Sequence, residues 1–258
     1  MNKNKFTILT ASYNSGRYLN DWADSILLQK YRPLEVVIVE DMSQDNSLHV
    51  LKKQINRFKL NNIEVKFIVN NKKMYCGSSY NLAFKKSTGY YFGILDSDDA
   101  LEPFVVEYIV DLYEKNKNIS WIYTQYNKYN RKMDRIIKRG FCRVPSNKKS
   151  ILDMEKNGIN TYGHWRTFSN RIHLKKNLFG KGLKCCVDKH LGFRLEEEGI
   201  GMFVDKVCYK YRTRSKGEKS VVFSNNLKKE REKICNIFVK RRKKNNNKIY
   251  GILNCKKT

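Results

Sequence analysis

The chain has 258 residues, 41% of them hydrophobic, so it can bury the core of one large or two small domains without disulfides or a structural metal. Its 52 Lys and Arg residues exceed its 25 Asp and Glu residues, and the formal net charge is +27. This excess leaves nucleic acid, an anionic membrane and acidic small substrates open as partners, although an AT-rich genome also enriches Lys and Asn. No stretch of about 18 apolar residues occurs, which excludes a membrane-spanning helix.

Strand patterns and helix patterns alternate over the first half of the chain. Short apolar runs rich in β-branched residues predict strands, and apolar residues at helical spacing predict the helices between them. The predicted strands are 6–11, 34–40, 63–69, 90–95 and 120–126, and the predicted helices are 16–29, 48–58, 78–87 and 103–115. This order predicts an α/β fold with a doubly wound, mostly parallel central sheet and helices on both faces.

Ligands of such sheets bind beyond the carboxyl ends of the strands. Asp41 and Asp96 each follow a predicted strand directly, so both are expected at that edge. Gly89 follows the helix at 78–87 and is expected to end it in the left-handed conformation.

The second half of the chain is less regular and strongly basic. Residues 127–150 hold nine Lys and Arg against one Asp and predict an exposed hairpin or loop. Short helices are expected at 151–158 and 188–198, with Glu196–Glu198 as the solvated end of the second one. Residues 225–258 hold twelve Lys and Arg against two Glu, which predicts an amphipathic helix followed by a disordered tail.

The number and spacing of the cysteines indicate whether the protein works in a reducing or an oxidising compartment. The seven cysteines form no Cys-x-x-Cys pair and their number is odd, which argues against a zinc ribbon or a disulfide framework. A reducing environment is the simpler explanation, so the sequence predicts a cytoplasmic protein.

Three aspartates, Asp96, Asp98 and Asp99, lie within four positions after the predicted strand at 90–95. Like charges so close together raise the energy unless a cation or hydrogen bonds compensate. Carboxylate oxygens suit Mg²⁺ or Mn²⁺, which proteins hold through one or two carboxylates plus a diphosphate. A helix cap is the alternative explanation, but a cap needs a single Asp. The segment therefore predicts a divalent metal site.

A second polar segment, VIVEDMSQDNS at 37–47, also follows a strand. An acid at this place can accept hydrogen bonds from a nucleobase or a ribose, which makes Asp41 a candidate. An ordinary turn between strand and helix, capped by Asp45, explains the same residues. The segment taken alone leaves both interpretations open.

Together with the first strand, these segments resemble the family-2 glycosyltransferases of the GT-A fold. The resemblance covers roughly residues 5–215 and rests on four segments in order: FTILTASYNSGRYL at 6–19, VVIVEDMSQD at 36–45, GSSYNLAFKKSTGYYFGILDSDD at 77–99 and VDKHLGFRLEEEG at 187–199. It implies a GT-A domain at 1–224, with a nucleotide-binding half at about 1–126 and an acceptor half at about 127–224. Residues 225–258 follow as a basic helix and tail.

The resemblance also implies roles for residues at matching positions. Ala11 and Tyr13 would line the nucleotide base, Tyr13 by stacking, and Asp41 would form a hydrogen bond with a uracil ring. Asp98 and Asp99 would hold the ribose and a Mn²⁺ or Mg²⁺ ion, with Asp96 as a further metal ligand. The donor would be a nucleotide sugar, with UDP as the expected nucleotide.

Asp188 matches the acidic residue that serves as general base in this family. It lies at the predicted start of a helix, where the helix dipole favours its ionised form. The resemblance thus implies a single displacement in which Asp188 deprotonates an acceptor hydroxyl on a glycan, lipid or protein, and the anomeric centre inverts. A helix cap is the alternative role for this residue.

The sequence departs from the family at two positions. Val187 stands where the family usually has a Glu before the base, and Tyr80 stands where it commonly has an Arg that contacts phosphate. Arg166 or Arg212 could take over that contact.

One other function stays open beside that of an enzyme. A non-catalytic basic protein on a degenerate transferase fold, which binds nucleic acid or an anionic surface, is the alternative to an enzyme. Nucleic acid is the disfavoured ligand, because no known motif for reading RNA or DNA occurs and few aromatics accompany the basic run at 240–248. The basic tail also predicts peripheral contact with an anionic membrane.

Overall fold

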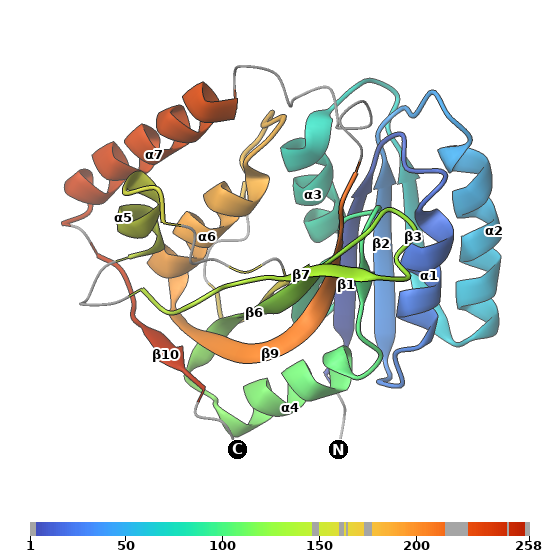
Figure 1. Cartoon of the computed structure of the whole chain (residues 1–258), viewed down its shortest axis with the longest axis horizontal. Coiled ribbons are helices and arrows are strands. Elements are labelled where there is room, and N and C mark those ends of the chain that lie inside the picture. Colours follow the sequence, from blue (N-terminus) through green and yellow to red (C-terminus); the bar gives the residue numbers. More distant parts are fainter. Residues whose placement is uncertain are drawn as a thin grey trace.

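One mixed sheet flanked by helices organises the chain (Figure 1). The computed structural model describes residues 4–145, 150–159, 163, 165–172, 177–214, 227–246 and 248–255. The strands are β1 (Phe6–Ser12), β2 (Leu34–Glu40), β3 (Ile63–Val69), β4 (Tyr91–Ile94), β5 (Ala100–Leu101), β6 (Ile119–Tyr129), β7 (Ile136–Arg139), β8 (Arg166–Ser169), β9 (Ile200–Arg212) and β10 (Ile252–Asn254). The helices are α1 (Leu19–Leu27), α2 (Ser47–Leu60), α3 (Tyr75–Lys86), α4 (Val105–Lys115), α5 (Ile151–Lys156), α6 (Val187–Glu198) and α7 (Leu227–Lys244).

The strands follow the order β10-β9-β6-β8-β4-β1-β2-β3, with β5 paired to β9 and β7 paired to β6. In the N-terminal half, β1 pairs in parallel with both β2 and β4, and β2 pairs in parallel with β3. All seven residues of β2 are buried, because it lies inside the sheet. Burial on both faces is the physical reason why its sequence, LEVVIVE, is apolar almost throughout. The predicted strands at 34–40 and 63–69 coincide with β2 and β3.

The strand β8 interrupts the parallel pattern, since it pairs antiparallel with both β4 and β6. Beyond it, β6 pairs in parallel with the long strand β9. Neither β8 nor β9 is among the strands that the sequence pattern predicts. β8 has four residues, and β9 carries the exposed Asp205 and Lys206 and bulges in its pairing, so neither shows an uninterrupted apolar run.

The prediction for Gly89 is wrong. Gly89 does not adopt the left-handed conformation, and α3 ends at Lys86 with Ser87, whose backbone is extended, as its C-cap. The glycine is needed for close approach instead, since a Cβ at this position would lie 2.3 Å from Thr7 Oγ1 on β1.

The prediction of a solvated helix end at Glu196–Glu198 is also wrong. Glu196 is 1% exposed, accepts a hydrogen bond from the Ile151 backbone at 2.6 Å, and forms an ion pair with Arg242 of α7 at 2.9 Å. Burial raises the pKa of Glu196, although Arg242 acts in the opposite direction. The acidic run therefore holds α7 against α6 rather than facing water.

The basic C-terminal segment forms the predicted amphipathic helix, α7, but its apolar face is used inside the protein. Ile234 and Phe238 are buried, and the Phe238 ring contacts His190 and Phe193 of α6. The expectation of a disordered end is wrong for residues 252–254, which form β10 and pair with β9. Across the described residues, no helix has the length and hydropathy that crossing a bilayer requires.

We predict that Phe238→Ala destabilises the protein by about 3–5 kcal/mol, because it removes a buried ring from the contact between α6 and α7. Ile237→Ala is the matched control. Its side chain is 52% exposed on the same helix, and the substitution should cost less than about 1 kcal/mol. Denaturant unfolding measures both, and equally small losses would show that α7 is not docked.

Candidate active site

The carboxyl ends of β1, β2 and β4 place the predicted donor-binding residues at one edge of the sheet. Ser12 and Glu40 are register partners at the ends of β1 and β2, so Tyr13 and Asp41 start neighbouring loops. Next to them, the Leu95 backbone donates to Leu9 of β1 at 3.1 Å, which brings the loop that starts at Asp96 to the same edge. Ala11 is half-buried and is the last residue but one of β1, directly before Ser12.

The loops after β1 and β2 are held together by hydrogen bonds. Asp45 accepts from the Gly16 backbone at 3.0 Å and from the Ser47 backbone at 3.0 Å at the start of α2. Asn14 accepts from the Gln44 backbone at 2.8 Å across the same pair of loops. Asp45 therefore stabilises the turn between β2 and α2, but it is not the helix cap, because the N-cap residue of α2 is Asn46.

Asp41 is buried and holds the loop that precedes α3. Its Oδ1 accepts from Asn70 Nδ2 and from the Met74 backbone, both at 2.8 Å, and its Oδ2 accepts from the Tyr75 backbone at 2.9 Å. Lys73 Nζ lies 3.2 Å from the same Oδ2. Tyr75 has a positive φ of 64°, a conformation that costs energy for a non-glycine residue and that these hydrogen bonds help to maintain.

Lys73 also covers the ring that the sequence assigns to base stacking. Its Nζ lies over the Tyr13 ring while it pairs with Asp41. A cation over an aromatic face is attracted by the ring quadrupole. A base that stacks on Tyr13 would therefore have to displace this ammonium group, and the sequence pattern gives no hint of the contact.

Glu40 is a candidate site residue that the sequence analysis does not name. It is buried at the end of β2, and its Oε1 accepts from the Ser43 backbone at 2.7 Å. Its Oε2 and the neighbouring Ser12 Oγ are buried without a hydrogen-bond partner in the described part of the chain. An unpaired buried carboxylate oxygen is costly, so this pair of oxygens fits a place where a ligand supplies donors. The sequence feature that could have identified it is an acidic residue at the end of an otherwise apolar strand.

Asp99 is the most buried of the three clustered aspartates. Its Oδ2 accepts from the Tyr209 hydroxyl and its Oδ1 from the Arg212 backbone, both at 2.7 Å. Burial, followed by the charges of Asp98 and Asp96, raises the pKa of Asp99 well above its usual value. Both donors belong to β9, so Asp99 ties the acidic loop to that strand.

Asp96 and Asp98 have different partners. Asp96 Oδ1 accepts from the Tyr80 hydroxyl at 2.6 Å, and Asp98 Oδ2 pairs with Arg214 Nε at 2.6 Å. Tyr80 stands where the family commonly has an arginine, and here its hydroxyl supports the acidic cluster. Burial raises the pKa of Asp96, and the charges of Asp98 and Asp188 raise it further, while Arg166 lowers it.

Asp96 and Asp98 are the two carboxylates of the cluster that could hold a divalent cation. No group of three or more His, Cys, Asp or Glu side chains converges as a complete metal cage within the described residues. However, no hydrogen bond or ion pair from those residues reaches the second oxygen of Asp96 or of Asp98. Two such hard ligands suit Mg²⁺ or Mn²⁺ when a diphosphate completes the coordination.

Arg212 has structural partners, which makes it a poor substitute for the missing phosphate-binding arginine. Its Nε donates to the Asp98 carbonyl at 2.6 Å, and its Nη2 pairs with Asp21 of α1 at 2.7 Å. It also donates to the Arg131 carbonyl, and it lies over the Tyr18 ring. These contacts fix the end of β9 against α1.

Arg166 lies between the acidic cluster and Asp188. It is buried on β8, its Nη1 is 3.7 Å from Asp188 Oδ2, and its charge lowers the pKa of Asp96. The antiparallel insertion of β8 between β4 and β6 puts this arginine there. Arg166 is therefore the better-placed cation of the two that the sequence proposed.

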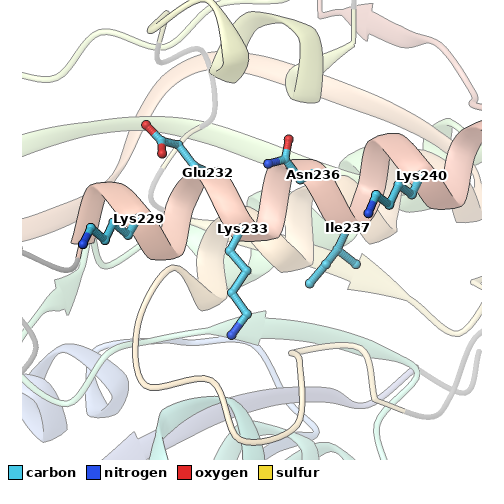
Figure 2. A pocket seen from close by; sticks show the side chains of 6 residues that line it. All are labelled: Lys229, Glu232, Lys233, Asn236, Ile237 and Lys240. Carbon is cyan, nitrogen blue, oxygen red and sulfur yellow. The ribbon is translucent and has the colours of Figure 1, made fainter.

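Asp188 is the second residue of α6, and its side chain is 39% exposed. The N-cap of α6 is Cys186, which has a φ of 56° and makes no side-chain cap. Asp188 is therefore not the N-cap residue, and its carboxylate is open to solvent on one side and faces Arg166 on the other. The hollow drawn in Figure 2 lies elsewhere, along α7, and is not part of this site.

Comparisons with known proteins give this geometry a context. The sequence profile of a family described as glycosyl transferase family 2 matches residues 7–178. The chain is 31% identical over 207 residues to a chondroitin synthase of Escherichia coli, which covers 79% of the chain and 28% of that protein. It is 31% identical over 203 residues to a hyaluronan synthase of Pasteurella multocida, which covers 79% of the chain and 20% of that protein. The chain thus spans less than a third of the length of these relatives.

Solved structures show the same fold at low sequence identity. TarS 1–349 of S. aureus in complex with UDP-GlcNAc has a TM-score of 0.61 and 17% identity, covering 92% of this chain and 72% of that one. GalNAc-T7 with UDP, GalNAc and Mn²⁺ has a TM-score of 0.64 and 15% identity, covering 93% of this chain and 50% of that one. The architecture of the central sheet and its helices is therefore the GT-A fold, as the sequence predicts.

Proposed function

The chain belongs to glycosyl transferase family 2. From that premise we propose that it moves a sugar from a UDP-sugar donor to a hydroxyl group on a glycan, lipid or protein. The observation that carries the proposal is the acidic cluster itself, in which Asp96 and Asp98 each have one described partner, Tyr80 and Arg214. Arg166 lies 3.7 Å from Asp188 and its charge also acts on Asp96. One side of this arrangement suits a diphosphate with its cation, and the other suits an acceptor hydroxyl. The names of the relatives, chondroitin and hyaluronan synthases, favour a glycan as acceptor.

The donor's base would lie in the site formed by Tyr13, Asp41 and Glu40, with Ala11 beneath it. Displacement of Lys73 from the Tyr13 ring would open the face for stacking, and the same ammonium could then pair with phosphate. The unpaired Glu40 Oε2 is buried, so it could accept from a ring N–H, which uracil has and adenine lacks, once the atoms that cover it move aside. This difference supports UDP over ADP as the nucleotide.

A Mn²⁺ or Mg²⁺ ion would be held by Asp98 and Asp96, and when bound it neutralises charge on the departing diphosphate. Asp99 uses both oxygens for donors from β9, so its role as a third ligand stays a prediction. Arg214 pairs with Asp98 and limits the negative charge of the cluster. Tyr80 fixes the orientation of the Asp96 carboxylate.

Asp188 would remove the proton from the acceptor hydroxyl as that oxygen attacks the anomeric carbon. Its position in the first turn of α6 and the neighbouring Arg166 both favour the ionised carboxylate that a base requires. The chain needs no covalent intermediate for this step, so one displacement inverts the anomeric centre.

We also propose a cytoplasmic location, which the seven free thiols fit. Contact with an anionic membrane stays a prediction, and it would be electrostatic, because the apolar side of α7 is buried. Fractionation of cells that express the chain, with and without a salt wash, tests both. The alternative function, a non-catalytic basic protein on this fold, requires that donor hydrolysis be absent under every condition below.

The nucleotide assignment predicts that UDP binds more tightly than ADP. Glu40→Gln should weaken UDP binding by roughly tenfold and narrow this preference, because a charged acceptor for the base is lost. Asp41→Asn should weaken all nucleotides, because it loosens the loop at 70–75. Calorimetry with UDP, GDP and ADP measures these affinities, and equal binding of all three by the unaltered protein would refute the assignment.

The metal assignment predicts that slow hydrolysis of the donor requires a divalent cation. EDTA or Asp98→Asn should reduce the rate by roughly a hundredfold or more, because the diphosphate charge is no longer neutralised. Asp111→Asn is the control, since it removes an exposed carboxylate on α4. Release of nucleoside diphosphate is the readout, and full activity in EDTA would contradict the assignment.

The base assignment predicts that Asp188→Asn lowers the rate of donor hydrolysis by roughly 10²–10⁴. In hydrolysis, water attacks in place of the acceptor hydroxyl, and the attacking water also has to lose a proton to a base. Donor affinity should stay nearly unchanged, because the substitution keeps the shape of the side chain. The rate and the affinity for UDP are measured separately. A variant that retains the full rate would show that another group is the base.

A further inference from the structure

The outward side of α7 carries positive charge that the protein does not neutralise. Lys229, Lys233 and Lys240 line an open hollow together with Glu232, Asn236 and Ile237 (Figure 2). We refer to these six residues as the lysine face. None of its three lysines forms an ion pair with any described residue. Across a helix that rises 1.5 Å per residue, the three charges are spread over roughly 16 Å.

The inward side of the same helix is neutralised by buried acids. Arg231 pairs with Glu155 of α5, and Arg242 pairs with Glu196 of α6. Arg241 pairs with Glu197 at 2.8 Å. These ion pairs and the buried ring of Phe238 fix α7 to the body, so the lysine face is a rigid surface. A solvated charge run would need no such anchoring on the other side of the helix.

The lysine face has a fixed relation to Asp188. Arg231, two residues beyond Lys229, shares the Glu155 carboxylate with Lys189, which lies 3.0 Å from it. Lys189 is the next residue after Asp188 in the first turn of α6. The N-terminal end of the lysine face is therefore tied to the start of α6, and Figure 1 shows α7 packed beside α6.

The chemistry of the face distinguishes between classes of anion. Single-stranded nucleic acid is held in part by aromatic rings on which its bases stack, and none of the six side chains offers such a ring. A helix that inserts into a membrane presents several apolar side chains outward, and this face presents Ile237 alone. A glycan that carries carboxylates would pair with the lysines, and Asn236 and Ile237 could contact hydroxyls and the apolar side of a sugar ring.

We propose that the lysine face binds an acidic glycan, whose sugars carry carboxylates, and directs the end of that chain toward Asp188. This inference rests on the proposed transferase function and names the class of its acceptor. The glycan's carboxylates pair with the lysines, and its terminal hydroxyl reaches the start of α6.

The test uses the full chain and oligogalacturonate as the probe. Replacing the three lysines together, as Lys229→Gln, Lys233→Gln and Lys240→Gln, should weaken binding by roughly tenfold at low salt, because three charge pairs are lost. High salt should weaken binding of the unaltered protein to a similar level. Donor hydrolysis and the thermal unfolding temperature should not change, since the lysines are exposed and lie outside the donor site.

A matched control separates this surface from net charge. Lys52→Gln, Lys53→Gln and Lys59→Gln remove the same charge from exposed positions on α2, and they should leave oligogalacturonate binding unchanged. An equal loss in both triple variants would refute the proposal, as would equal binding of neutral dextran.

Two further probes distinguish other partners. Vesicles containing phosphatidylserine, or single-stranded DNA, should bind more weakly than oligogalacturonate. Tighter binding of either one, lost in the Lys229/Lys233/Lys240 variant, would overturn the glycan assignment. Absence of donor hydrolysis in the unaltered protein would instead refute the proposed function, while a lysine-dependent affinity for oligogalacturonate would still support the surface.

Discussion

Repulsion among three carboxylates at the end of β4 is the constraint on which the rest of the site depends. The fold compensates for it from separate elements, since Tyr80 comes from α3 and Tyr209 and Arg212 come from β9. Arg214, just beyond β9, pairs with Asp98. Each of these groups satisfies one carboxylate oxygen. The hydrogen bonds and the ion pair thus offset part of the repulsion, and the proposed cation would offset more of it.

The insertion of β8 connects the two halves of the protein. Because β8 lies between β4 and β6, its first residue, Arg166, reaches both the acidic cluster and Asp188. One buried arginine therefore faces the donor side and the proposed base at once. The length of β9 has a related effect, since it pairs with β6 along its course and delivers Tyr209 and Arg212 to Asp99 at its end. Residues of β9 thus contribute hydrogen bonds to the acidic loop that follows β4.

The helix α7 combines two kinds of electrostatics. Its inward arginines form pairs with buried glutamates, where leaving either partner alone would be costly. Its outward lysines are solvated and carry the excess charge of the segment. A net charge of +27 suggests many anionic partners. However, the arginines of α7 already pair with glutamates of the protein, whereas the lysines of its outward face are exposed to an external anion. The separation into two faces explains why a basic segment can be both part of the folded body and a binding surface.

The sequence by itself determined the strands and helices of the N-terminal half and the edge at which Asp41 and Asp96 meet, because these depend on local periodicity and on the geometry of parallel sheets. The resemblance to the family also named the fold, and the comparisons confirm it. Only the tertiary structure decided that Glu40 Oε2 lacks a described partner, that Lys73 covers Tyr13, and that Glu196 is buried. The tertiary structure was also needed to identify the short strand β8, the bulged strand β9 and the docking of the C-terminal segment. These features depend on contacts between residues far apart in the chain, and such contacts leave no periodic pattern in the sequence.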